Sequence, residues 1–189
     1  MEFNCKKLKK KEGNINLMIC YMGLIIVTLL IAFSMARNRV SILHNRIEDS
    51  LVASNLAAAT VDINKYADEG IIVNIDREDV KKSYDAFIST LKSNLELKDD
   101  MTLKESSFIS SKINVEKFII YSDLKTHTQI NQVSSNGAIS SSTGSVGMST
   151  PNGKKVKDTT IYAKLSFQIT FMGKTMNVSK DNVVVVTEK

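Results

Sequence analysis

Apolar residues are concentrated in one long run near the N-terminus of the chain. Residues 17–36 contain only two frankly polar side chains, Thr28 and Ser34, and no charge. A helix needs about 20 apolar residues to cross the hydrocarbon core of a bilayer. The pattern therefore predicts a transmembrane helix over residues 14–36. The side chains expected to anchor it in lipid include Leu17, Leu24, Ile25, Leu30 and Phe33.

Beyond this run the apolar residues still recur with the spacing of a helix, but they occupy only one narrow stripe along it. The stripe recurs at steps of seven, four and three, through Val40, Ile47, Leu51, Ser54, Ala58 and Val61. No proline or glycine occurs between Arg37 and Asp68, and Gly70 is the first plausible helix stop. We therefore expect residues 37–69 to continue the helix, to about Ala67. Its expected packing residues are Leu51, Ala57, Ala58 and Val61.

Residues 70–189 have the pattern of an α+β domain outside the membrane. Residues 71–73 are a candidate short strand, and Asp76 is placed to begin a second helix that extends to about Leu97. One face of this helix is apolar, which predicts that it lies on a sheet. The residues of that face are Val80, Tyr84, Phe87, Ile88, Leu91 and Leu95.

The second half of the domain shows the alternation of strands. Residues 115–122 are rich in β-forming side chains, and residues 126–133 are a candidate polar partner. Residues 160–172 alternate strictly, which predicts one buried face and one solvated face. Gly173 and Lys174 fit a two-residue turn with glycine first, and residues 176–186 would form the return strand. A C-terminal antiparallel sheet is therefore expected.

The segment 134–153 has a different composition from the strands around it. Sixteen of its 20 residues are Ser, Thr, Gly, Asn or Pro. Such a segment has little apolar surface to bury, so the sequence predicts a mobile, solvated surface loop. A contact loop for a partner subunit is the alternative interpretation.

Charge is concentrated in a basic leader, residues 1–13, which holds five lysines and two acids. The remaining 20 of the 25 basic and 18 of the 20 acidic residues nearly cancel. A basic leader before an apolar helix favours a cytoplasmic N-terminus, although Arg37 and Arg39 follow the helix. No basic face with interleaved aromatic residues is present beyond it, so we expect no nucleic-acid partner.

Three kinds of N-terminal processing are compatible with an apolar helix of this type. Lipoprotein maturation at Cys20 is disfavoured, because Ile19 precedes it and Cys20 does not close the apolar run. Signal peptidase cleavage after Ala36 has a passable site, but the apolar region is too long for a signal peptide. Cleavage after Gly13 would leave Asn14 first and keep the helix as an anchor. An uncut signal anchor is equally compatible with the leader.

These features together resemble one known family. Gly13 after a basic leader, the apolar stretch, Arg37-Asn38-Arg39 and the alanine-rich segment 55–59 resemble TadE-like proteins, the pseudopilins of Tad/Flp-type type IV pilus systems. The resemblance covers about residues 6–61 and lies in the layout more than in a motif. It implies a pilin-like α+β fold, cleavage by a prepilin peptidase, and assembly with other pilin or secretion-system subunits.

The chain departs from that family at one position. The family usually has a glutamate at the fifth position after the cleavage glycine, where this chain has Met18. That glutamate is thought to pair with the N-terminal amine of a neighbouring subunit, and methionine cannot form such a pair. Three readings remain: the subunit assembles differently, it occupies a special position such as a tip, or it is not cleaved at Gly13.

The sequence offers no constellation of catalytic residues. Its two histidines, His44 and His127, lack a neighbouring Cys or His at ligand spacing, and no serine-nucleophile or phosphate-loop motif occurs. We therefore expect a structural protein without a cofactor, a metal or enzymatic activity, held in the cell membrane. The alternative is an uncleaved, membrane-anchored binding domain that does not polymerise.

Overall fold

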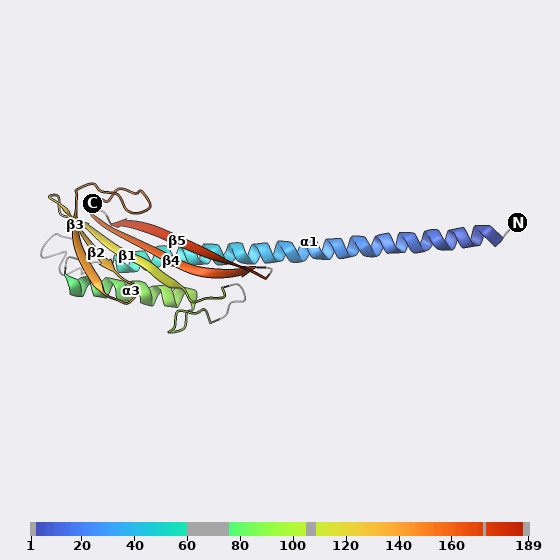
Figure 1. Ribbon diagram of the computed structural model, residues 1–189, viewed down its shortest axis with the longest axis horizontal. Coiled ribbons are helices and arrows are strands. Elements are labelled where there is room, and N and C mark those ends of the chain that lie inside the picture. Colours follow the sequence, from blue (N-terminus) through green and yellow to red (C-terminus); the bar gives the residue numbers. More distant parts are fainter. Residues whose placement is uncertain (1–2, 60–75, 105–108, 172, 187–189) are drawn as a thin grey trace. The chain divides into compact units, whose positions relative to one another are not determined.

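The computed structural model describes the backbone of residues 3–59, 76–104, 109–171 and 173–186, and side chains from residue 14 onward. The chain divides into two compact units, Met1–His44 and Asn45–Lys189. Two helices and a five-stranded sheet make up the described part (Figure 1). This confirms the α+β class expected from the sequence, with a long N-terminal helix, a second helix and an antiparallel sheet.

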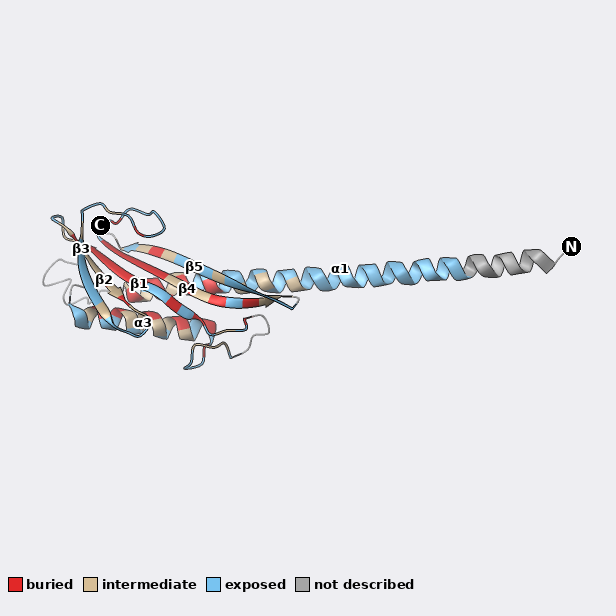
Figure 2. Ribbon diagram, in the orientation of Figure 1, coloured by how far each residue is buried: buried red, intermediate tan, exposed pale blue. Residues whose placement is uncertain are grey.

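The first unit consists of helix α1 (Phe3–Ala58) as far as His44. Its apolar run is exposed all round, as the pale blue ribbon of Figure 2 shows, and none of its most hydropathic window is buried. The hydroxyl of Thr28 donates a hydrogen bond to the carbonyl of Ile25 at 2.8 Å. The polar group of this side chain is therefore satisfied within the helix, as a lipid environment requires.

The last turns of α1 belong to the second unit and are amphipathic. Ile47, Leu51, Ser54 and Ala58 are buried, which confirms these members of the stripe expected from the periodicity. The helix ends at Ala58 in the described residues. The expected continuation to about Ala67, the stop at Gly70 and the candidate strand at 71–73 lie outside them.

Helix α3 (Arg77–Leu95) follows, and it ends two residues earlier than expected. Asp76 occupies the N-cap position, but its side chain makes no capping hydrogen bond. Glu96 ends the helix in a left-handed conformation, with φ at 52°. The carboxylate of Glu96 lies 2.7 Å from the guanidinium of Arg46, which also donates to the carbonyl of Asn94. This contact ties the end of α3 to the last part of α1.

The sheet has the order β3-β2-β1-β4-β5, and each neighbouring pair is antiparallel. Its strands are β1 (Asn114–Asp123), β2 (Thr128–Val133), β3 (Ile139–Gly144), β4 (Thr159–Phe171) and β5 (Lys174–Val186). The expected C-terminal hairpin is confirmed, but its turn differs by one residue. Phe171 pairs with Lys174, so Gly173, with φ at 77°, is the last residue of the turn and not its first.

Both helices contact the same face of the sheet, which we call the inner face. The ring of Phe118 in β1 lies 4.9 Å from the ring of Phe87 and 5.3 Å from that of Tyr84, both on α3. On the same face, the side-chain amide of Asn55 in α1 donates to the carbonyl of Asn182 in β5 at 3.2 Å. Alternate residues of β4 point into this layer and form much of the core, shown in red in Figure 2.

The opposite, outer face is covered in part by the connection from β3 to β4, residues 145–158. Met148 and Val156 of this connection pack on an apolar cluster formed by four residues of the strands. These residues are Ile119, Tyr121, Tyr162 and Val183. Tyr162, expected on the solvated face of its strand, is therefore only 3 % exposed.

The prediction of a solvated loop over 134–153 is wrong in part. Residues 139–144 form β3, an edge strand that pairs with β2 along its whole length. Thr150 is buried, and Met148 is partly buried against the outer face. The polar composition was misleading because an edge strand can be held by backbone hydrogen bonds and needs little apolar surface of its own.

Candidate functional site

The apolar part of α1 is the first candidate, because its exposure would be costly in water. Leu17, Leu24, Ile25 and Leu30 are each more than half exposed, and Phe33 is 49 % exposed. Each such side chain left in water forgoes about 1.5–3 kcal/mol of burial free energy. The whole run forgoes tens of kcal/mol, more than the roughly 5–15 kcal/mol that stabilises a typical fold. This helix is therefore a candidate membrane anchor.

The expected processing residues lie inside the same helix. Gly13 and Asn14 both belong to α1, which continues through them without a break. Gly13 therefore does not break the helix, and what favours cleavage there is the close access to the backbone that a residue without a side chain gives a peptidase. Asn14 is exposed, so nothing in the described chain covers the residue that would become the N-terminus.

The expected packing residues have different environments. Leu51 and Ala58 are each 1 % exposed and form part of the core of the folded unit, whereas Ala57 is half-buried. Val61 lies outside the described residues. Ala58 thus packs within the folded unit to which the last turns of α1 belong.

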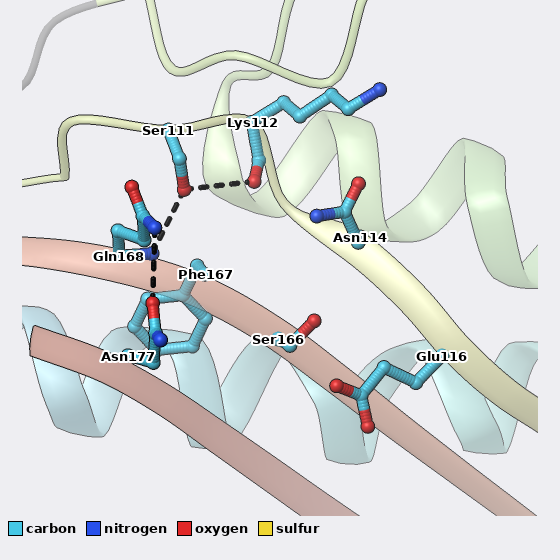
Figure 3. Close-up of a pocket in the computed structure, with 8 residues that line it drawn as sticks. All are labelled: Ser111, Lys112, Asn114, Glu116, Ser166, Phe167, Gln168 and Asn177. Atoms are coloured by element: carbon cyan, nitrogen blue, oxygen red, sulfur yellow. Dashed lines mark hydrogen bonds between the residues drawn. The ribbon is translucent and has the colours of Figure 1, made fainter.

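A second candidate site is a polar pocket on the open part of the outer face, with a volume of about 380 Å³. Its lining residues come from β4, β5, the start of β1 and the segment before β1, and Figure 3 shows them together. They are Ser111, Lys112, Asn114, Glu116, Ser166, Phe167, Gln168 and Asn177. The connection between β3 and β4 does not contribute to this lining.

A β-bulge creates one edge of the pocket. Val115 pairs with Leu165 and Lys117 pairs with Lys164, so Glu116 is an extra residue in β1. Because of the bulge, both Glu116 and Lys117 are exposed between two buried neighbours. The carboxylate of Glu116 then lies 2.7 Å from the ammonium of Lys164. Hydrogen bonds from Lys164 and Ser166 hold the pKa of the Glu116 carboxyl below its ordinary value of 4.5.

This ion pair predicts a change in acid stability. A carboxyl whose pKa is lower in the folded state stabilises the fold above pH 4.5, and this contribution is lost as the pH falls through the folded pKa. The Glu116→Gln substitution should therefore lower the urea midpoint of the full-length protein at pH 7 and change it little at pH 3. The effect should be small, because the side chain of Glu116 is 38 % exposed.

The control for this measurement is Glu78→Gln on α3, where an exposed glutamate pairs with Lys82 at 3.1 Å. An exposed pair one helical turn apart contributes only about 0.3–0.5 kcal/mol, so this variant should resemble the wild type at both pH values. An equal loss at pH 7 and pH 3 for Glu116→Gln would show that the pair with Lys164 does not stabilise the fold.

Hydrogen bonds orient the other end of the pocket. The backbone N–H of Gln168 donates to the hydroxyl oxygen of Ser111 at 2.8 Å, where a neighbouring strand would normally offer a carbonyl. The side-chain amide nitrogen of Gln168 donates to Asn177 Oδ1 at 3.0 Å. The pocket therefore lies at the end of the pairing between β1 and β4, where hydrogen bonds to side chains replace those between the two backbones.

The sequence contained only a partial signal for this pocket. The alternation of residues 160–172 placed Ser166 and Gln168 on the solvated face, which is correct. The contribution of Asn114, Glu116 and Asn177 depends on strand register and on the bulge, which no local pattern reveals. Within the described residues, no group of three His, Cys, Asp or Glu side chains is placed to hold a metal ion.

Comparisons of the chain with protein-family models, with curated proteins and with solved structures gave no match.

Proposed function

We propose that this protein is a pseudopilin-like structural or assembly subunit of a type IV pilus or secretion system of the Tad/Flp type. One observation carries the proposal: a single helix is apolar and exposed in its first part and supplies core residues to an α+β unit in its last turns. A subunit that must remain in the membrane and later pack beside its neighbours needs both properties in one helix.

The free energy of assembly depends on the medium that surrounds the apolar helix before and after it. Its side chains find an apolar environment either in lipid or against the corresponding helices of neighbouring subunits. A transfer from the membrane into a filament core would keep them away from water, so the hydrophobic effect would oppose it little. The proposed partners are accordingly membrane lipid, a prepilin peptidase and other pilin or secretion-system subunits, with the folded unit outside the cytoplasm.

The mature N-terminus tests this proposal. Intact mass of the native membrane protein should show a chain that begins at Asn14, because the leader is removed and the helix is kept. The Gly13→Val variant should retain Met1, since a β-branched side chain obstructs a peptidase that must approach the backbone closely. The matched control is Gly23→Val in the same helix, where an added Cβ atom meets nothing within 4 Å. This variant should still be processed to Asn14.

Two other results would contradict the proposal. A native chain that begins at Met1 would favour the alternative, an uncleaved and membrane-anchored binding domain, in keeping with the unbroken helix at Gly13 and with Met18 in place of glutamate. A native chain that begins at Arg37 would mean that the apolar helix is a signal peptide and that the folded unit is released.

A further inference from the structure

The outer face of the sheet is divided into a covered half and an open half. The connection 145–158 covers the apolar half through Met148 and Val156. The open half, near Ser166 and Gln168, holds the polar pocket of about 380 Å³. Its volume falls within the roughly 300–1,000 Å³ of typical small-ligand sites. A pocket of this size is large enough to hold a small ligand.

We infer that this pocket binds a saccharide. Three of its lining side chains, Asn114, Gln168 and Asn177, are primary amides, and Ser166 adds a hydroxyl. Each amide offers both donors and an acceptor, and each sugar hydroxyl does the same, so the two can exchange hydrogen bonds in either direction. The inference does not depend on the proposed assembly role.

The amide groups are partly oriented before any ligand binds. Gln168 uses its side-chain nitrogen to hold Asn177 Oδ1, which leaves Gln168 Oε1 as an acceptor and Asn177 Nδ2 as a donor. Neither atom bonds to another residue in the described part of the chain. In Figure 3 these two amides lie next to each other, and Asn114, Ser166 and Glu116 follow across the pocket. A ligand with several hydroxyls along one edge could engage both groups.

The charge of the pocket favours a neutral or weakly acidic ligand. Glu116 is paired with Lys164, so its carboxylate can accept a hydrogen bond from a sugar hydroxyl without leaving an unbalanced charge. Among the described residues that line the pocket, Lys112 alone is cationic, which is too little for a phosphate-rich ligand. Phe167 is only 4 % exposed and offers little apolar surface. Hydrogen bonds must therefore carry recognition, and we expect a dissociation constant on the order of 1 mM.

Saturation-transfer NMR on the full-length protein tests the inference. The protein should be held in lauryldimethylamine oxide micelles, because detergents with sugar headgroups would compete for the pocket. The probes are chitotetraose and maltotetraose, with the peptide Gly-Ser-Thr-Gly as a third. At least one tetrasaccharide should bind, and the Asn114→Ala and Gln168→Ala variants should each weaken binding about tenfold, as expected for a lost hydrogen bond to an oriented ligand.

The matched control is Asn94→Ala, an exposed asparagine on α3 that does not line the pocket, and it should leave saccharide binding unchanged. The inference is overturned if neither tetrasaccharide binds at a ligand concentration of about 10 mM, which is tenfold above the expected dissociation constant. It is also overturned if Asn94→Ala weakens binding as much as Asn114→Ala. Binding of the peptide alone would also overturn it and would assign the pocket to an extended chain. These outcomes are independent of the mature N-terminus, so either proposal can fail without the other.

Discussion

Two arginines in the middle of the apolar helix, introduced together as Ile26→Arg and Leu30→Arg, should release the chain from the membrane fraction. Both side chains are more than half exposed in the structure, so neither substitution disturbs a packed core. Each arginine at the centre of a membrane helix costs about 2.5–3.5 kcal/mol of insertion free energy. The pair should therefore cost about 5–7 kcal/mol, enough to shift a chain from integrated to extractable. Extraction of membranes with alkaline carbonate measures this directly.

The control for this experiment is the pair Asn38→Arg and Ile42→Arg. It has the same spacing on the same helix, and both residues are exposed, but it lies beyond the apolar run. This variant should remain in the carbonate-resistant pellet with the wild type. If the wild-type chain is itself extracted by carbonate, or if the Ile26 and Leu30 pair stays in the pellet, the helix is not a membrane anchor.

The second large effect is expected in the core of the folded unit, for the Phe118→Ala substitution. Phe118 is fully buried, and its ring contacts Phe87 and Tyr84 of α3 from the centre of the sheet. Removal of a buried phenylalanine ring typically costs about 3–5 kcal/mol, through lost burial and the cavity left behind. Because a domain of this size is stabilised by roughly 5–15 kcal/mol, this variant should be close to unfolding.

Urea unfolding of the full-length protein in micelles measures the effect, with near-ultraviolet circular dichroism as the signal because the chain has tyrosines but no tryptophan. The matched control is Phe33→Ala, the same substitution at a 49 % exposed position in the first unit. It should leave the midpoint of the folded unit unchanged. Equal midpoints for the two variants would mean that α3 does not depend on Phe118 for its attachment to the sheet.

The elements that were predicted correctly are those that a local pattern specifies. The apolar run of α1, the stripe through Ile47 and Leu51, and the apolar face of α3 all follow from helical spacing along one segment. The alternation of residues 160–172 likewise predicted β4 to within one residue at each end. Helical and strand periods are short, so a single segment of sequence contains them completely.

The errors arose where backbone pairing or a distant segment overrides local composition. β3 forms in a serine-rich segment because β2 supplies its hydrogen-bond partners. Tyr162 is buried because the connection through Met148 and Val156 crosses the face that alternation assigned to solvent. Neither the formation of β3 nor the burial of Tyr162 can be recognised from the spacing of nearby residues. Each depends on a contact between segments that are far apart in the sequence.

The candidate pocket depends even more strongly on tertiary structure. Its residues come from separate segments, and a shift of one residue in either strand pairing would turn Asn114 or Asn177 to the opposite face. The bulge at Glu116 brings its carboxylate to Lys164. The amino-acid pattern therefore specifies an apolar helix joined to an α+β domain, because those features are local. The register of the sheet decides which polar side chains meet, because hydrogen bonding between distant strands sets that register.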